Sequence, residues 1–258
     1  MDLKIKNKIV LVAGSSRGIG YGIAEGFLKE SSKVIITGRD KDNLNKAFNI
    51  LSSKYNLDNI YKFNCDFNNA LSVKKLYSFL NENFEGIDVL INNVGTGTSV
   101  PDAIPDDKAW KHSWDINFEA SLMATRVLYP LLEKNKNSSI LFISSIAAKE
   151  AFGAPVAYST AKTALNAFAK NLARKVALKV RVNVLAPGNV FFENGSWDKK
   201  MSENPSEVKK LIKQTVPMNR FASLEEIANS AIFLCSEASS FTTGSVLVVD
   251  GGQTVSIF

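Results

Sequence analysis

The segment IVLVAGSSRGIG, residues 9–20, joins a run of five apolar residues to a glycine-rich turn. A continuous apolar run of this length is typical of a strand that is buried on both faces of a parallel sheet. Gly14, Gly18 and Gly20 allow a tight turn, and apolar residues at helical spacing follow them. A helix that starts there offers free N–H groups and a positive dipole end to an anion. The segment therefore predicts a strand, a turn and a helix with an anion-binding site between them.

Strand-like and helix-like segments then alternate along the rest of the chain. The other short apolar runs lie at residues 34–37, 60–63, 89–91, 140–143, 180–186 and 246–249. Amphipathic segments of helical length lie at residues 18–30, 42–55, 69–84, 118–132, 157–178 and 225–234. Such alternation implies right-handed crossover connections. We therefore expect an α/β fold of the Rossmann type, a doubly wound, seven-stranded parallel sheet with helices on both faces.

One stretch departs from this alternation. Residues 189–204 carry Gly195, Trp197 and several polar residues, and we expect them to be irregular. We interpret the region around residues 189–215, called the lid segment below, as a mobile cover for a substrate. No linker, repeat or low-complexity block divides the rest, so we expect a single domain over residues 1–258.

Composition narrows the class of protein. Hydrophobic residues make up 45% of the chain and charged residues 22%, which is ordinary for a globular protein with a large core. The net charge of +6 favours anionic partners, but the absence of a dense Lys/Arg block argues against nucleic acid. The N-terminal apolar run is short for a signal peptide, and no run approaches the about 20 apolar residues of a membrane span. We expect a soluble, cytoplasmic protein without a membrane partner.

Residue types that bind metals are scarce. Cys65 and Cys235 lie far apart and fit no metal-ligand spacing or disulfide framework. The single histidine, His112, is interpreted as a surface or packing residue. We therefore expect no metal site.

The region after the second expected strand bears on the choice of dinucleotide. NAD sites of the Rossmann type place Asp or Glu there to bind the ribose 2′-hydroxyl. In this chain Arg39 follows Gly38, Asp40 comes one residue late, and Arg17 lies in the glycine turn. Two guanidinium groups can clamp a 2′-phosphate, although two solvated surface arginines are the plain alternative. The pattern favours NADP(H) over NAD(H).

A second set of polar residues predicts proton transfer. Tyr158 and Lys162 are four residues apart, so on a helix their side chains share a face. The ammonium would stabilise the phenolate and lower the pKa of Tyr158 from about 10 toward the working range. Ser145 follows the fifth expected strand, at the edge where parallel sheets bind ligands, and its hydroxyl can donate to a substrate carbonyl.

Together these motifs make the chain resemble the short-chain dehydrogenase/reductase family in its compact single-domain form. The resemblance runs nearly from end to end, and the order and spacing of the motifs are specific. It is carried by the glycine turn, Asp66, Asn92-Asn93-Val94-Gly95, Asn117, Ser145, Tyr158, Lys162, Pro187-Gly188 and Val249-Asp250-Gly251-Gly252.

The resemblance implies roles for four catalytic residues. Tyr158 would protonate the carbonyl oxygen during reduction and act as base in reverse. Ser145 would hold and polarise that carbonyl. Lys162 would bind the nicotinamide ribose and support Tyr158, and Asn117 would position a water that links Lys162 to solvent.

The resemblance also implies the cofactor contacts of an NAD(P)-binding Rossmann domain. Asp66 would contact the adenine amino group, Asn93 the ribose region, and Val190 the nicotinamide carboxamide through its backbone. The complete expected set is Gly14, Ser16, Arg17, Gly18, Ile19, Gly20, Arg39, Asp66, Phe67, Asn93, Gly95, Tyr158, Lys162, Pro187, Gly188 and Val190.

Two positions depart from the family pattern. Val94 stands where alanine is common, which is a small packing change. Phe192 stands where a threonine usually bonds the carboxamide, so that contact is lost or supplied otherwise. Phe191 and Phe192 would line an apolar substrate pocket or pack the loop onto the core.

These observations favour an NADPH-dependent oxidoreductase that acts on a small-molecule carbonyl or alcohol. The chain is similar to 3-oxoacyl-[acyl-carrier-protein] reductases, so a carrier-linked 3-oxoacyl thioester is the first substrate to consider. A basic rim near the site would suit an acidic carrier, or would be plain solvated surface; its residues are Lys134, Lys136, Arg174, Lys175 and Lys179. Sugar, polyol, steroid-like and other small ketone or alcohol substrates stay open. A non-catalytic dinucleotide sensor is disfavoured because Ser145, Tyr158 and Lys162 are all present.

The resemblance further implies a homodimer or homotetramer. Its contacts would come from the expected helices at residues 118–132 and 157–178 and from the last strand. The apolar tail at residues 255–258 fits a buried C-terminus.

Overall fold

Seven parallel strands form one sheet in the computed structural model, which describes residues 2–98, 100 and 102–257. The strand order is β3-β2-β1-β4-β5-β6-β7, so the chain winds outward from β1 in both directions. The strands are β1 (Ile9–Ala13), β2 (Lys33–Gly38), β3 (Ile60–Asn64), β4 (Val89–Asn92), β5 (Ser138–Ile143), β6 (Val180–Pro187) and β7 (Val246–Val249). The expected doubly wound Rossmann-type sheet is confirmed.

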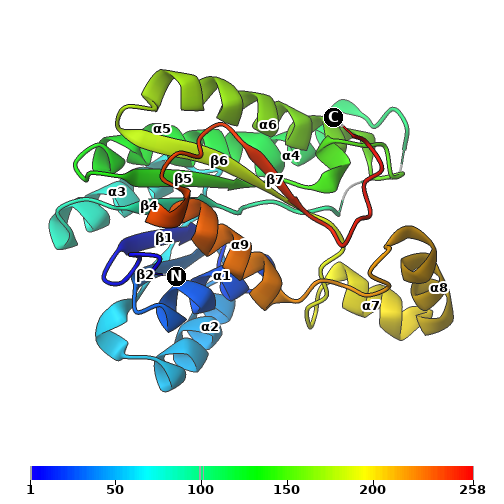
Figure 1. The fold of residues 1–258 in the computed structure, drawn as a ribbon, viewed down its shortest axis with the longest axis horizontal. Helices are drawn as coiled ribbons and strands as arrows, with labels where there is room; N and C mark the ends of the chain where they lie inside the picture. Colours follow the sequence, from blue (N-terminus) through cyan, green and yellow to red (C-terminus); the bar gives the residue numbers. More distant parts are fainter. Residues whose placement is uncertain (1, 99, 101, 258) are drawn as a thin grey trace.

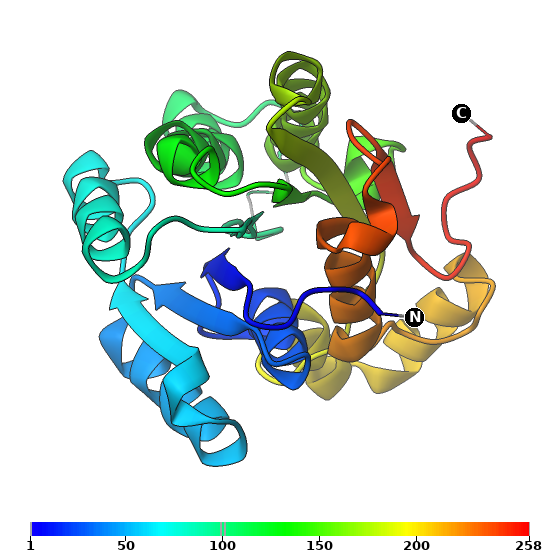
Figure 2. The ribbon, with the colours of Figure 1, turned by 60° about the vertical axis from the view of Figure 1, so that its left-hand side comes forward.

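Helices cover both faces of this sheet, as Figures 1 and 2 show. One apolar core lies between the sheet and α1, α2 and α9, and a second lies between the sheet and α3, α5 and α6. The bounds are α1 (Gly18–Lys29), α2 (Lys41–Lys54), α3 (Ala70–Asn83), α4 (Asp107–Trp114), α5 (Ala120–Leu132), α6 (Val156–Val176), α7 (Ser196–Glu203), α8 (Pro205–Thr215) and α9 (Leu224–Cys235).

The first strand explains why its residues are apolar without alternation. Val10 and Val12 enter the core beneath α1 and α9, whereas Leu11 and Ala13 enter the core on the opposite face. Successive side chains of a strand point to opposite faces, so a sheet covered on both sides requires apolar residues at every position. The same argument holds for the apolar runs of β4, β5 and β6.

Residues 189–204 differ from the expectation of an irregular stretch, because they contain the helix α7, and α8 completes the lid segment. Asn204 caps α8 by accepting a hydrogen bond from Glu207 N, and Pro205 occupies the first helical position. Val208 and Ile212 lie one turn apart and are buried, so a short helical repeat was present in the sequence. Figure 1 shows the pair beside the three layers, at the edge where β6 ends.

A second difference from the expected structure lies just before α5, the helix that connects β4 to β5. The expected helix at residues 118–132 is preceded by α4 and by one π-helical turn, Asp115–Glu119, which together make a nearly continuous helical stretch. Single π turns inside helices are frequent at functional sites. Asn117, one of the expected site residues, lies in this turn.

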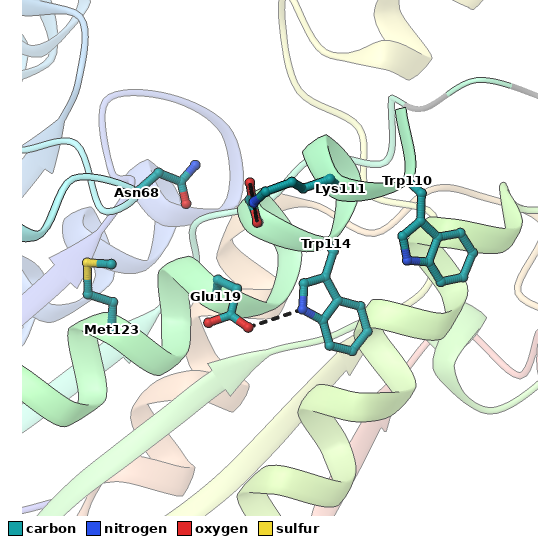
Figure 3. Close-up of a pocket in the computed structure, with 7 residues that line it drawn as sticks. Asn68, Trp110, Lys111, Trp114, Glu119 and Met123 are labelled. Carbon is teal, nitrogen blue, oxygen red and sulfur yellow. Dashed lines mark hydrogen bonds and ion pairs between the residues drawn. The ribbon is translucent and has the colours of Figure 1, made fainter. Parts of the chain in front are cut away.

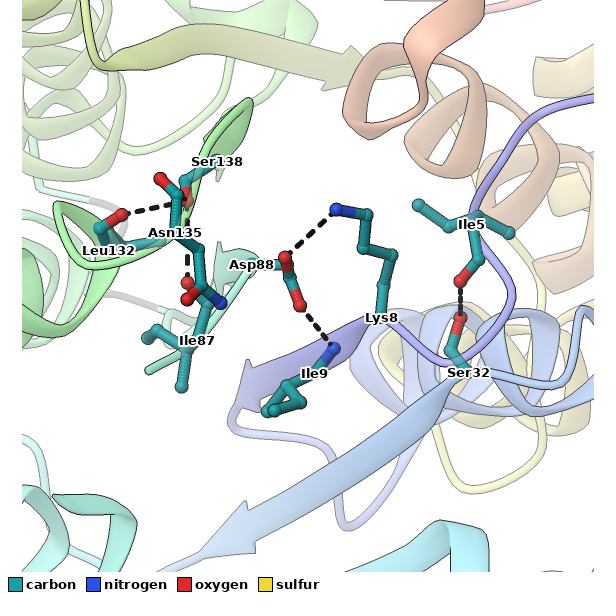
Figure 4. A network of polar contacts seen from close by, with 9 residues as sticks. All are labelled: Ile5, Lys8, Ile9, Ser32, Ile87, Asp88, Leu132, Asn135 and Ser138. Atoms are coloured by element: carbon teal, nitrogen blue, oxygen red, sulfur yellow. Dashed lines mark hydrogen bonds and ion pairs between the residues drawn. The ribbon is translucent and has the colours of Figure 1, made fainter. Parts of the chain in front are cut away.

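Polar contacts fix the amino ends of the central strands (Figure 4). Asp88 accepts hydrogen bonds from Lys8 Nζ at 3.0 Å and from Ile9 N at 2.8 Å, which ties β1 to β4. Ser138 Oγ donates to Leu132 O at 2.8 Å and so joins β5 to the end of α5. These contacts leave the carboxyl edge of the sheet free for a site. Over the described ranges, no helix is both long and apolar enough to cross a bilayer.

Candidate active site

The glycine turn between β1 and α1 is held by its neighbour strand. Gly14 and Gly18 have positive φ angles, +70° and +60°, which favour glycine. A Cβ on Gly20 would lie 2.3 Å from Gly14 O and 2.4 Å from Asn93 Nδ2, so no larger residue fits. Asn93 Nδ2 donates to Gly14 O at 2.7 Å. The side chain of Asn93 therefore positions the turn, in addition to the ribose contact that the resemblance implies.

The N-terminus of α1 suits an anion. Arg17 stands at the N-cap with an extended backbone, and no side chain caps the helix. The first turn contains no acidic residue. The free N–H groups there and the positive end of the helix dipole fit the pyrophosphate of a dinucleotide. The predicted contacts Gly18, Ile19 and Gly20 all lie in this first turn.

The adenosine end lies beside the carboxyl end of β2. Arg17 and Arg39 are exposed, and neither forms a salt bridge with a residue that the structure describes. Asp40 caps α2 by accepting a hydrogen bond from Asn43 N at 2.8 Å. Its carboxylate therefore has a structural task, which agrees with excluding it as the acid of an NAD site. Ser16 packs against Gly38, where an added Cβ would lie 3.1 Å from Ser16 Oγ.

The loop after β3 holds two expected contacts in different ways. Asp66 is exposed, and one of its carboxylate oxygens accepts a hydrogen bond from Asn68 N at 3.0 Å. The Phe67 side chain is buried in the core beneath α3, so only its backbone faces the carboxyl edge. The Asp66 side chain is thus open to solvent after β3, and Phe67 anchors the loop on the core.

The three central catalytic candidates converge at the end of β5. Ser145 lies two residues after this strand, and Tyr158 and Lys162 lie in the first two turns of α6. The Ser145 side chain lies close enough to the Tyr158 hydroxyl to lower the pKa of this phenol. Ser145 Oγ also accepts from Ala147 N at 3.1 Å, which fixes its side chain. A hydroxyl and a phenol are thereby aimed at one point beside the sheet edge.

The electrostatics of this pair differ from the sequence prediction. Burial raises the pKa of Tyr158 above 10, and the Ser145 side chain opposes that rise only in part. Lys162 is 4% exposed and donates to Ile143 O at 2.9 Å, and burial lowers its pKa to about 8. The predicted lowering of the tyrosine pKa by the lysine is therefore wrong for this conformation. The physical reason is that burial disfavours the charged phenolate, while the ammonium of Lys162 is turned toward Ile143 O.

Asn117 and Gly95 lie against Lys162. Asn117 Oδ1 accepts from Thr96 N at 2.9 Å, and its Nδ2 donates to Ser113 O at 3.0 Å. A Cβ on Gly95 would lie 2.8 Å from Asn117 Oδ1 and 3.1 Å from Lys162 Nζ. The segment after β4 therefore packs between the two side chains and requires glycine there. Sequence reasoning could not find the backbone partner Ile143 O, because any residue type supplies a carbonyl.

The end of β6 presents backbone groups to the same edge. Gly188 N donates to Val249 O at 3.0 Å, and a Cβ on Gly188 would lie 2.7 Å from that of Asp250. Gly188 therefore allows a close approach of two chain segments. Val190 and Ala222 pair as an isolated parallel β-bridge. Its hydrogen bonds to Ala222 are made by the two residues that flank Val190. Its own N–H and C=O point to the other side, as the predicted carboxamide contact requires.

Phe192 occupies a position that the sequence left open. A Cβ on Gly18 would lie 2.9 Å from two atoms of the Phe192 ring, and one on Gly195 would lie 2.8 Å from the ring. The ring therefore lies across the first residue of α1. Phe191 points elsewhere and packs on Phe221 with ring centroids 5.7 Å apart. The two phenylalanines do not form one wall.

The expected basic rim is not near the site. Arg174 and Lys175 lie in the last turn of α6, and Lys175 is roughly 25 Å further along the helix than Tyr158. Lys179 pairs with Glu133 at 2.9 Å at the same far edge. A crossover helix runs antiparallel to its strands, so its C-terminal end lies at the opposite edge of the sheet from the site. The suggestion of a rim for an acidic carrier is wrong.

The remaining features lie outside the site. A groove of about 680 Å³ runs along α4 and α5 (Figure 3). Its lining residues are Asn68, Trp110, Lys111, Trp114, Asp115, Glu119 and Met123. His112 is exposed on α4, and Cys65 and Cys235 are buried free thiols. The described residues contain no cluster of three metal-binding side chains.

Known proteins resemble this chain over nearly its whole length. Residues 13–254 match the family described as enoyl-(acyl carrier protein) reductase. The 3-oxoacyl-[acyl-carrier-protein] reductase FabG of Aquifex aeolicus is 33% identical over 262 aligned residues, which cover 98% of this chain and all of that protein. The short-chain dehydrogenase/reductase SDRA of Arabidopsis thaliana is also 33% identical, and the match covers 97% of this chain and 96% of that protein.

Solved structures share the fold as well. L-sorbose reductase from Gluconobacter frateurii, solved with NADPH and L-sorbose, superposes with a TM-score of 0.92. The two chains are 31% identical, and the match covers 100% of each.

Proposed function

The chain belongs to the short-chain dehydrogenase/reductase family, and from this premise we propose that it reduces a carbonyl substrate with NADPH. Members of this family are oxidoreductases that act on alcohol and carbonyl groups. The observation that carries the proposal is the convergence of Ser145, Tyr158 and Lys162 at the carboxyl end of β5. The uncapped N-terminus of α1 lies at the same edge of the sheet.

Two side chains act on the substrate in this proposal. Ser145 donates a hydrogen bond to the carbonyl oxygen and holds it beside the Tyr158 hydroxyl. Tyr158 then gives its proton to that oxygen, and the reverse reaction returns it. The raised pKa of Tyr158 keeps the phenol protonated at neutral pH, which suits the acid of a reduction. The bound nicotinamide supplies the hydride.

Lys162 and Asn117 support the proton transfer. Lys162 would turn from Ile143 O toward the nicotinamide ribose, and its ammonium would then lie closer to the phenol of Tyr158. With a pKa of about 8, this lysine can gain and lose a proton near neutral pH. Asn117 packs beside it across Gly95 and would position the water of a proton relay.

The preference for NADPH is proposed from Arg17 and Arg39. Both guanidinium groups are exposed and unpaired among the described residues, at the ends of neighbouring strands. A 2′-phosphate would gain charge-assisted hydrogen bonds there, whereas the nearest carboxylate for a 2′-hydroxyl, Asp40, already uses one oxygen to cap α2. The NADPH in the sorbose reductase structure agrees with this choice.

For the substrate we propose two candidate classes rather than a single compound. Similarity to FabG favours a 3-oxoacyl thioester, and the match to L-sorbose reductase makes a sugar or polyol ketone the second candidate. The helices α7 and α8 stand at the edge where the site opens, which supports a substrate cover around residues 189–215.

We also propose a single cytoplasmic domain that assembles as a homodimer or homotetramer. Val255 and Ile257 of the C-terminal tail are 85% and 88% exposed in the single chain, so the expected burial would need a partner subunit. Phe258 lies outside the described residues. The groove along α4 and α5 supports contacts on the face that carries α5.

Steady-state kinetics test the function. The purified chain would be assayed with NADPH and NADH against a 3-oxoacyl thioester, a ketose and a simple ketone. We expect turnover that is faster with NADPH and is lost in Ser145→Ala and Tyr158→Phe. NADPH binding without turnover on any carbonyl would contradict the enzyme assignment and favour a dinucleotide sensor.

A further inference from the structure

The ring of Phe192 covers the place where α1 would receive a phosphate. Its edge lies so close to Gly18 that a Cβ there would be 2.9 Å away. Gly18 is the first residue of α1, whose N-terminus lacks a side-chain cap. Phosphates bind at such helix ends because several N–H groups point outward together. The aromatic ring packs on the Cα side of Gly18 and adds an apolar surface beside this helix end.

The same ring is joined rigidly to the lid segment. Gly195 N donates to Phe192 O at 3.1 Å, which closes a tight turn, and Asn194 has a φ of +59° within it. Asp198 accepts a hydrogen bond from Asn194 N at 2.8 Å and so fastens this turn to the first turn of α7. The ring also packs against Gly195, the N-cap of α7. A movement of the Phe192 ring therefore changes the packing at the N-cap of α7.

A separate aromatic group holds the other side of α7. Phe191 and Trp197 both pack on Phe221, with ring centroids 5.7 and 5.3 Å away. Lys200 Nζ lies 4.7 Å from the centroid of the Trp197 ring. Phe221 is outside α7, so this group gives the helix a fixed point about which it can turn.

We propose that Phe192 is a gate for the pyrophosphate end of the cofactor cleft and couples cofactor binding to the lid segment. In the closed position the ring covers Gly18. A dinucleotide binds only after the ring has swung away from Gly18, and the contact of the ring with Gly195 transmits this movement to α7. The inference rests on the proposed use of a dinucleotide, and it concerns the order of events rather than the chemistry.

Two probes separate the gate from the rest of the cleft. NADP⁺ contains the pyrophosphate and binds only after the ring has swung away. Adenosine 2′-monophosphate contains only the adenosine end, which Arg39 would bind, and leaves Gly18 untouched. Calorimetric titration of both probes into the wild-type chain gives the reference affinities. If NADP⁺ does not bind the wild type at all, the proposed function fails, and the gate fails with it.

A matched pair of variants tests the ring itself. Phe192→Leu and Phe191→Leu each replace a phenylalanine by a smaller apolar residue, at adjacent positions. Since a closed state reduces apparent affinity by the open fraction, we expect Phe192→Leu to bind NADP⁺ about five- to tenfold more tightly. Phe191→Leu should bind NADP⁺ as the wild type does, and neither should alter binding of adenosine 2′-monophosphate. Equal or weaker NADP⁺ binding in Phe192→Leu, or the same gain in Phe191→Leu, would overturn the gate.

Binding kinetics need no substitution of the ring. In stopped-flow mixing, the observed rate for NADP⁺ should level off at high concentration, because ring opening precedes binding. The rate for adenosine 2′-monophosphate should rise linearly with concentration. A linear rise for both probes would show that nothing opens before NADP⁺ binds.

Fluorescence of Trp197 tests the coupling to α7. With Trp110→Phe and Trp114→Phe in place, Trp197 is the remaining tryptophan. We expect its emission to change over the same NADP⁺ concentrations as the calorimetric signal, and not with adenosine 2′-monophosphate. Adding Phe192→Leu should remove most of that change. An emission unaffected by NADP⁺ would refute the coupling.

Discussion

The two ends of the proposed cleft are built in opposite ways. At the end of β5, Lys162 is buried and donates a hydrogen bond to Ile143 O, and Tyr158 lies beside Ser145. At the end of β2, Arg39 is exposed and has no ionic partner among the described residues. Proton transfer requires groups that are positioned before the substrate arrives. Selection of a phosphate requires charges that stay free until the phosphate arrives.

The largest expected effect comes from breaking the catalytic end alone. Tyr158→Phe removes the acid while keeping the ring, so kcat should fall about 10²- to 10⁴-fold. NADPH should still bind, because the glycine turn and the arginines are unchanged. Steady-state kinetics and a fluorescence titration with NADPH measure the two effects separately. A variant that kept most of its kcat would mean that another group supplies the proton.

The buried lysine should make the catalytic end sensitive to pH. The pKa of Lys162 is lowered to about 8 in the folded chain. Between that pH and the ordinary lysine pKa, the unfolded chain holds more protons at this residue, so the free energy of unfolding rises with pH. From pH 7 to pH 10 the wild type should gain about 2 kcal/mol relative to Lys162→Met.

Urea unfolding of both proteins at the two pH values and one protein concentration measures this gain. The comparison between wild type and variant cancels the titration of all other groups. A difference that stays constant with pH would mean that the lysine is not desolvated as the structure has it.

A smaller effect is expected from breaking the adenosine end alone. Arg39→Ala should lower kcat/KM for NADPH about tenfold by removing charge-assisted hydrogen bonds to the 2′-phosphate. The value for NADH should stay unchanged, because no contact to a 2′-hydroxyl is lost. Lys41→Ala, on an exposed neighbour at the start of α2, is the matched control. Equal losses with both cofactors would assign Arg39 to folding rather than to selection.

No effect is expected from a residue that belongs to neither end. His112 is exposed in the last turn of α4, away from the residues of both ends. His112→Ala should leave kcat unchanged and alter the free energy of unfolding by less than about 0.5 kcal/mol. The same kinetic assay and urea unfolding measure both quantities, and a large loss in either would give the histidine a role that its surroundings do not indicate.

The regular parts of the fold were predictable because their signals are local. The apolar run at residues 9–13 is β1 itself, and the expected helix at residues 42–55 differs from α2 by one residue at each end. Burial on both faces forces such runs, whatever the rest of the chain does. The irregular structure expected for residues 189–204 was wrong, because α7 is short and polar and its N-cap Gly195 was read as a loop residue.

The candidate site also combines features that the sequence predicted with features that it did not. The sequence identified Ser145, Tyr158 and Lys162 from residue type and spacing, and the fold brings them together. It did not predict that the lysine bonds a backbone carbonyl, since a carbonyl has no sequence signature. Nor did it predict the reversed shift of the tyrosine pKa, which depends on burial.

By itself, the sequence determined where most strands and helices lie, the glycine turn and the residue types at the site. These features depend on periodicity and residue type, which act over a few neighbouring residues. Only the tertiary structure decided that Phe192 lies on Gly18, 174 positions earlier in the chain. Only the tertiary structure also carried the basic residues of α6 to the far edge of the sheet. Such contacts between distant segments depend on how the layers pack, and no local pattern in the sequence encodes them.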